Sequence, residues 1–186
     1  MNPAEAFRHF GLAAIVVFWV AVLLVFRKWG VVRSSSISSH LVAQRKAYVI
    51  FALASGISQG LFLLFIFNLF APHFQFGRFF EYLMAVGTLG YAAAAVFPDT
   101  KGISHQAHLV GAWTMACSML IGVFLLAASN HMENPVRWLA LSLGVTMVGL
   151  LGTAFLLDHV KTHYLSYQAT YLVCFHSAIL ITVYVR

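Results

Sequence analysis

The stretch FPDTKGISHQAH, residues 97–108, separates two long apolar runs of the chain, roughly residues 79–97 and 106–128. It contains an acid (Asp99), a base (Lys101) and the turn signal Pro98-Asp99. Because the stretch is short and polar, it predicts a tight connection between two antiparallel elements. The polar groups within it are surrounded by sequence that is compatible with lipid.

The composition predicts a membrane protein. Of the 186 residues, 61% are hydrophobic and 9% are charged, whereas a soluble domain has about 25% charged residues. The formal net charge is +6, but the basic residues flank apolar runs and form no face of their own. This arrangement argues against nucleic acid as a partner. It is typical of membrane proteins, in which basic residues beside the spans set the orientation of the chain.

Six apolar runs follow one another along the chain, and a helix needs about 20 apolar residues to cross a bilayer. Backbone groups inside lipid must be satisfied internally, so the runs are predicted to be helices. We expect an all-α polytopic membrane protein, a single domain over residues 1–186 that forms a six-transmembrane-helix bundle with short antiparallel connections. The predicted helices span about residues 9–28, 47–70, 79–97, 105–128, 136–157 and 167–185.

Small and aromatic residues inside the runs give two packing expectations. Gly56-x-x-x-Gly60 and the small pairs near it predict close approach between helices of the chain, with a helix dimer face as the alternative. The phenylalanine-rich run at residues 61–70 is expected to face lipid.

Basic residues concentrate in the connection after the first helix. Under the six-helix topology, one side of the membrane carries Arg27, Lys28, Arg33, Arg45, Lys46, Lys101 and Lys161, and the other carries Arg8, Arg78, Arg137 and Arg186. The positive-inside rule therefore predicts an integral protein of the cell membrane, with loop 27–47 in the cytoplasm and both termini outside. The expected partners are the lipid bilayer and other membrane subunits.

The nine histidines sort by membrane face under this topology. One face is expected to carry His40, His105, His108, His159 and His163 together with Asp99 and Asp158, and the other His9, His73 and His131.

The spacing on the first face suggests a metal hypothesis. His105 and His108 share a helix face, as do His159 and His163, and such ligands can hold zinc in a tetrahedron. Asp99 or Asp158 would then act as the catalytic base. The alternatives are interfacial histidines that bond to loop carbonyls or lipid headgroups, and a pH-sensing cluster.

His176 is expected deep inside the last helix. An ionisable side chain in a span usually faces the bundle or a cavity. One hypothesis is a functional role for His176, either as a haem ligand or in a proton relay. The alternative is a neutral imidazole that forms a hydrogen bond with a neighbouring helix.

Three short motifs resemble those of a known family. They are Ser36-Ile-Ser-Ser-His40, Val96-Phe97-Pro98-Asp99 followed by a histidine that opens the next helix, and Tyr167-Gln168. The order is similar to the six-helix family called domain of unknown function 998, which is akin to the Frag, DRAM and Sfk type of membrane proteins. The resemblance implies six helices and a polar cluster at one face.

A second resemblance concerns spacing alone. Ser36-x-x-x-His40 and His159-x-x-x-His163 mimic the zinc-binding elements of the seven-helix hydrolases that include alkaline ceramidases. Ser36 and His40 are therefore candidate ligand-binding residues.

These patterns support three hypotheses of function. The first is non-catalytic binding of a lipid, a small amphiphile or a membrane partner. The second is a zinc-dependent intramembrane hydrolase, and the third is an accessory subunit of a larger membrane complex.

Overall fold

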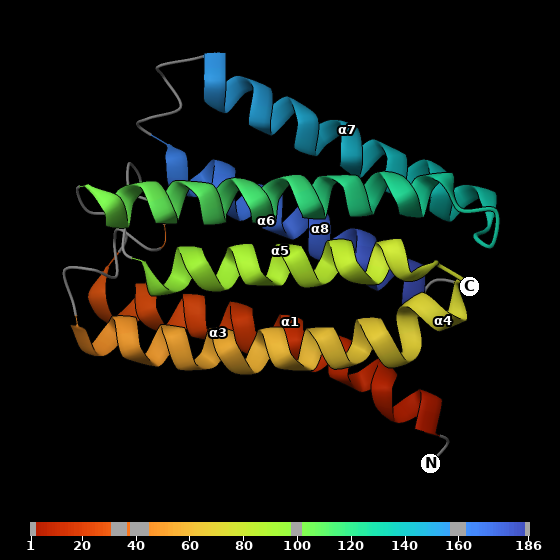
Figure 1. Ribbon diagram of the computed structural model, residues 1–186, viewed down its shortest axis with the longest axis horizontal. Helices are drawn as coiled ribbons and strands as arrows, with labels where there is room; N and C mark the ends of the chain where they lie inside the picture. The colour runs from red at the N-terminus through yellow and green to blue at the C-terminus, as the bar shows by residue number, and fades with distance from the viewer. Residues whose placement is uncertain (1–2, 31–36, 38–44, 98–101, 157–162, 185–186) are drawn as a thin grey trace.

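The structure, a computed structural model, describes residues 3–30, 37, 45–97, 102–156 and 163–184. These residues form helices that lie side by side as a bundle, with no strand among them (Figure 1). The elements are α1 (Pro3–Trp29), α3 (Arg45–Phe65), the π-helix η1 (Ile66–Phe70), α4 (Ala71–His73), α5 (Arg78–Val96), α6 (Ile103–Ala128), α7 (Asn134–Leu156) and α8 (Tyr164–Tyr184).

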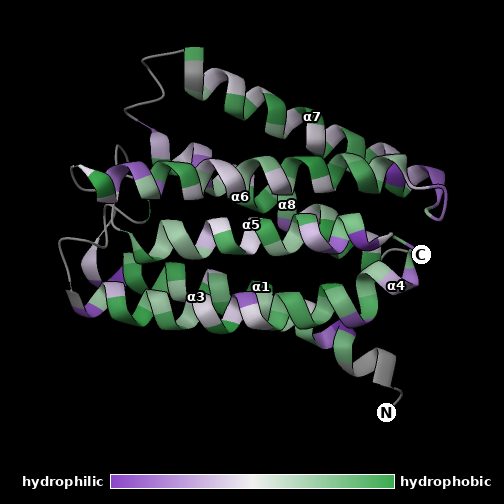
Figure 2. Ribbon diagram, viewed as in Figure 1, coloured by the Kyte–Doolittle hydropathy of each residue, from purple (hydrophilic) through white to green (hydrophobic). Residues whose placement is uncertain are grey.

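Within the described ranges, six helices are long and apolar enough to cross a membrane. Apolar residues run along their lengths, and much of the polar sequence lies at their ends (Figure 2). The predicted all-α six-helix fold is therefore confirmed. α1 begins and α8 ends at the same end of the bundle (Figure 1), as an even number of spans requires.

The second span is longer than the sequence predicted, because α3 continues through η1 into α4 and ends at His73. Phe65, Ile66 and Phe70 in this region are almost completely buried. The ring of Phe70 lies 5.8 Å from that of Phe80 on α5, centroid to centroid. The expectation that the phenylalanine run faces lipid was wrong for Phe62, Phe65, Ile66 and Phe70, which are buried, whereas Leu64 and Phe67 are exposed. The buried rings form an aromatic core that joins the second and third spans.

A direct backbone contact joins α5 to α6. A Cβ atom added to Gly90 would lie 2.7 Å from the carbonyl oxygen of Gly111, and one added to Gly111 would lie 2.6 Å from that of Gly90. These backbones touch, and only glycine permits that distance.

The expectation for Gly56 and Gly60 was wrong for packing within the chain. A Cβ atom at either position would meet no described atom within 4 Å, and both glycines are exposed on α3. A small-xxx-small spacing fits a close crossing but does not specify that a partner helix lies there.

The contrast between these glycines gives a direct test. We expect Gly111→Ala to destabilise the protein by about 1–3 kcal/mol or more, because its methyl group would collide with backbone that cannot rotate away. Gly56→Ala is the matched control and should leave stability unchanged or slightly higher, since its Cβ meets open space. Thermal unfolding of both variants in the same detergent measures the difference, and equal melting temperatures would contradict the close contact.

Candidate functional site

The C-terminal end of α5 lies at the polar connection with which the sequence analysis began. An α-helix leaves its last four carbonyl groups without intrahelical donors, and among the described residues the last such bond of α5 runs from the Phe97 N–H to the Ala93 oxygen at 2.9 Å. The hydroxyl of Tyr48, near the start of α3, donates to the carbonyl oxygens of Ala95 at 2.6 Å and Val96 at 2.8 Å. The single O–H donor of Tyr48 is thus shared between the middle two carbonyls.

His108 on α6 satisfies the other two. Its Nδ1 lies 2.8 Å from the carbonyl oxygen of Ala94 and 3.0 Å from that of Phe97. Because both partners are acceptors, Nδ1 must carry the proton. The side chain is buried, with 6% of its surface exposed, so two neighbouring helices together cap the end of α5.

The remaining predicted site residues are described only in part. His105 lies one helical turn before His108 on α6. The carbonyl of His163 accepts the Ser166 N–H at 2.9 Å, which places His163 at the start of α8. The other candidates lie outside the described residues: Ser36, His40, Asp99, Asp158 and His159.

The three described histidines lie at one end of the bundle, but they do not by themselves define a metal centre. Among the described residues, no group of three or more His, Cys, Asp or Glu side chains is placed to hold an ion. The zinc site at His105, His108, His159 and His163 therefore stays a prediction.

Two of the short family-like motifs meet at the same end. Ile37, which is 4% exposed, donates its backbone N–H to Oε1 of Gln168 on α8 at 3.1 Å. Ile37 is thereby bonded to the first turns of the last helix.

His176 lies in the middle of the bundle. Its Nδ1 accepts a hydrogen bond from the indole Nε1 of Trp19 on α1 at 3.0 Å, and the rings of Phe18 and Phe175 lie within 6 Å of its ring, centroid to centroid. A neutral ring that accepts at Nδ1 carries its proton at Nε2. The imidazole therefore has a partner on a neighbouring helix, and its cofactor role stays a prediction.

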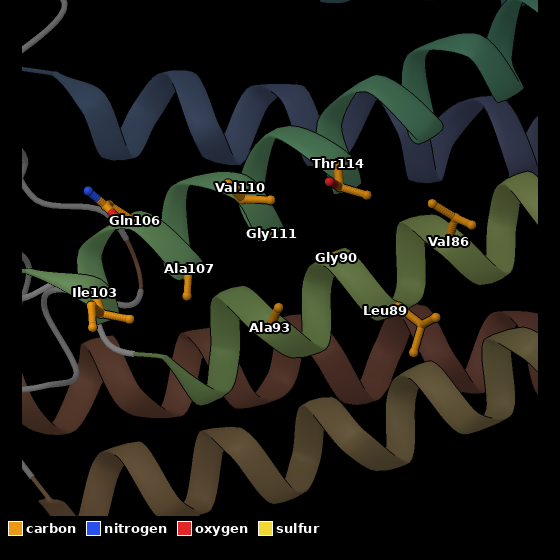
Figure 3. A pocket seen from close by; sticks show the side chains of 10 residues that line it. All are labelled: Val86, Leu89, Gly90, Ala93, Ile103, Gln106, Ala107, Val110, Gly111 and Thr114. Carbon is orange, nitrogen blue, oxygen red and sulfur yellow. The ribbon is translucent and has the colours of Figure 1, made fainter.

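A groove lies between α5 and α6 (Figure 3). Its volume is about 510 Å³, and most of its lining is apolar. Gly90 and Gly111 form its narrowest part, and Ala93 and Ala107 point into the space between the helices (Figure 3). The lining consists of Val86, Leu89, Gly90, Ala93, Ile103, Gln106, Ala107, Val110, Gly111 and Thr114.

Sequence reasoning missed this groove. The sequence has small residues at positions 87, 90 and 92–95, but such residues by themselves indicate close helix packing and no hollow. The same small side chains that allow contact at Gly90 leave a hollow beside it. The alternation of small residues with Val86, Leu89 and Val110 is the signal that could have indicated a hollow.

A second cavity, of about 340 Å³, lies at the opposite end of the bundle. His73, His131 and Glu133 line it, together with Thr182 of α8. The sequence placed the two histidines at this face but gave them no role. Glu133 lies two residues after His131, and this pairing is the sequence feature that could have indicated a shared polar cavity.

Comparison with known proteins adds no assignment, since no protein-family model, curated protein or solved structure matches the chain. The candidate sites are therefore defined by their own geometry.

The carbonyl cap can be tested by removing its donors. We expect Tyr48→Phe and His108→Leu each to cost about 1–3 kcal/mol of stability, because each leaves two carbonyls without a donor in an apolar setting. Tyr82→Phe is the control, since Tyr82 is 59% exposed and its hydroxyl has no hydrogen-bond partner among the described residues. Chemical or thermal unfolding of the three variants would refute the cap if all three behaved like the wild type.

Proposed function

We propose that the protein binds a lipid or a small amphiphile in the groove between α5 and α6. The observation that carries the proposal is an apolar hollow of about 510 Å³ on the surface of two membrane-spanning helices. This volume is within the range of about 300–1,000 Å³ that small-molecule sites occupy.

The lining fits a hydrocarbon chain. Leu89, Val110 and Ile103 are exposed apolar side chains along the groove, and the glycine contact lets a chain lie close to the backbone. Inside a bilayer, a hydrocarbon chain gains little binding free energy from apolar contacts with these residues, because the surrounding lipid offers similar contacts. Selectivity must therefore come from the shape of the groove. A narrow floor with branched walls provides such a shape.

One end of the groove is polar. Gln106 lines it near the start of α6, and the helix begins after Gly102, whose φ of +71° is a conformation that favours glycine. From Ile103 to Thr114 the groove follows α6 for about 16 Å, at about 1.5 Å per residue. An amphiphile would place its polar head by Gln106 and its chain toward Thr114.

The carbonyl cap supports this geometry. Tyr48 and His108 hold the end of α5 against α3 and α6, and Ala94, whose carbonyl contacts His108, directly follows the groove-lining Ala93. A binding surface whose helices are fixed in this way loses little conformational entropy when it is occupied.

A groove-filling substitution tests the proposal. Ala107→Trp should weaken binding of cis-parinaric acid, a fluorescent single-chain amphiphile, by about tenfold or more, because the indole would occupy the space between the helices. Fluorescence titration of the purified protein in a non-ionic detergent measures the affinity.

Ala92→Trp is the matched control, because Ala92 is exposed on α5 and does not line the groove. It should leave the affinity within about twofold of the wild type. Equal binding by the wild type and both variants would contradict the proposal. A loss of self-association in Ala107→Trp without any effect on the probe would instead favour a partner helix as the occupant.

We also propose that the basic connection 27–47 faces the cytoplasm and that both termini lie outside. Arg27 and Lys28 in the last turn of α1 support this orientation, because cytoplasmic ends of spans are enriched in Lys and Arg.

A reporter fusion measures the orientation. Alkaline phosphatase joined after Arg186 should be active in a bacterial host, since it folds only outside the cytoplasm, and green fluorescent protein at the same position should be dark. The reverse pattern would show that the chain inserts the other way round.

A further inference from the structure

A cavity of about 450 Å³ lies between the end of α6 and the start of α7, at the end of the bundle away from the carbonyl cap. Its apolar wall includes Phe124 and Leu141, and its polar side consists of Asn134 and Arg137. It shares no lining residue with the α5–α6 groove.

Arg137 is positioned by one hydrogen bond, and its other N–H groups remain available as donors. Its Nε donates to the carbonyl oxygen of Ala127 at 3.1 Å, one of the carbonyls that the end of α6 leaves unbonded. Among the described residues, its two Nη groups have no hydrogen-bond partner. A guanidinium fixed at Nε presents its remaining N–H groups as a planar fork, which matches the oxygens of a phosphate.

The surroundings favour an anion at this place. α7 starts at Asn134, and the first N–H groups of a helix carry partial positive charge. Glu133, the nearest carboxylate along the described chain, lines the separate cavity with His73 and His131. Among the described residues that line the cavity of Arg137, none is a carboxylate.

The position of the cavity in the fold indicates which kind of anion would bind there. α6 and α7 are both apolar enough to span a membrane, so their connected ends lie at headgroup depth. Trp138, which is 68% exposed beside Arg137, belongs to the residue type enriched at that depth. The apolar wall continues from Arg137 toward the interior of the bilayer.

We propose that this cavity binds the phosphodiester group of a membrane phospholipid. The Nη groups of Arg137 and the side-chain amide of Asn134 donate to phosphate oxygens, and one acyl chain lies between Phe124 and Leu141. The site is independent of the amphiphile groove, and either can exist without the other.

Native mass spectrometry of the full chain in non-ionic detergent tests this site. The probe is dioleoyl phosphatidylglycerol, with dioleoylglycerol as the analogue without phosphate. The wild type should retain the phospholipid at least tenfold better than dioleoylglycerol. Arg137→Gln should reduce phospholipid retention about tenfold or more, as expected when a charge-assisted pair is lost.

Two further variants keep the test decisive if Arg137→Gln fails to fold because its bond to Ala127 is lost. Leu141→Trp fills the apolar wall and Asn134→Leu removes the second donor, and each leaves Arg137 intact. Both should lower phospholipid retention. The control is Arg78→Gln, an exposed arginine at the same end of the bundle, which should retain phospholipid like the wild type.

The proposal is overturned if the Arg137, Asn134 and Leu141 variants all bind like the wild type, or if Arg78→Gln weakens binding equally, since surface charge alone would then explain retention. Displacement of the phospholipid by millimolar inorganic phosphate would also overturn the lipid as the source of the anion. A stable dimer that persists in the wild type and is lost in Leu141→Trp, without lipid retention in either, would assign the cavity to a second copy of the chain.

Discussion

Backbone carbonyl groups that a helix leaves unbonded in an apolar setting must find donors elsewhere, and this constraint is met most clearly at the end of α5. The hydroxyl of Tyr48 and the imidazole of His108 satisfy the last four carbonyls between them. Leaving partly buried groups of this kind without a donor costs about 1–3 kcal/mol. Phe97, which precedes Pro98, is extended (φ −94°, ψ 104°), as expected for a residue before proline. The cap therefore stabilises a helix end that the sequence itself favours, and it links that end to α3 and α6.

Further along the bundle, single polar side chains link pairs of helices in the same way. Ser58 on α3 donates to the carbonyl of Ala14 on α1 at 2.8 Å, and Tyr171 on α8 donates to that of Ala116 on α6 at 2.6 Å. The pair of Trp19 and His176 joins α1 to α8. Between apolar helices in lipid, such bonds and close packing replace the hydrophobic driving force that acts in water. His176 thus belongs to a set of contacts that hold the bundle together.

The fold could be predicted because bilayer thickness sets the length of a membrane-spanning helix. Apolar runs of that length can be counted directly in the sequence. The faces of the helices could not be predicted so well, because lipid-facing and core-facing positions are both apolar. Phe70 and Gly56 illustrate this. Phe70 was expected to face lipid but is buried, and Gly56 was expected to pack against another helix but is exposed. Topology alone placed His105, His108 and His163 at one end. The capping bond of His108 and the groove depend on three-dimensional contacts that no spacing in the sequence specifies.

The groove lies along the helix pair that the cap and the contact of Gly90 with Gly111 hold together. The most direct test of amphiphile binding uses a fatty acid with a photoactivatable diazirine in its chain, cross-linked in native membranes and mapped by mass spectrometry of peptides. The account predicts that labelling concentrates on residues 86–93 and 103–114. Labelling spread equally over these residues and the exposed face of α3 around Gly56 would contradict it, because the chain would then be in contact with lipid without selecting it.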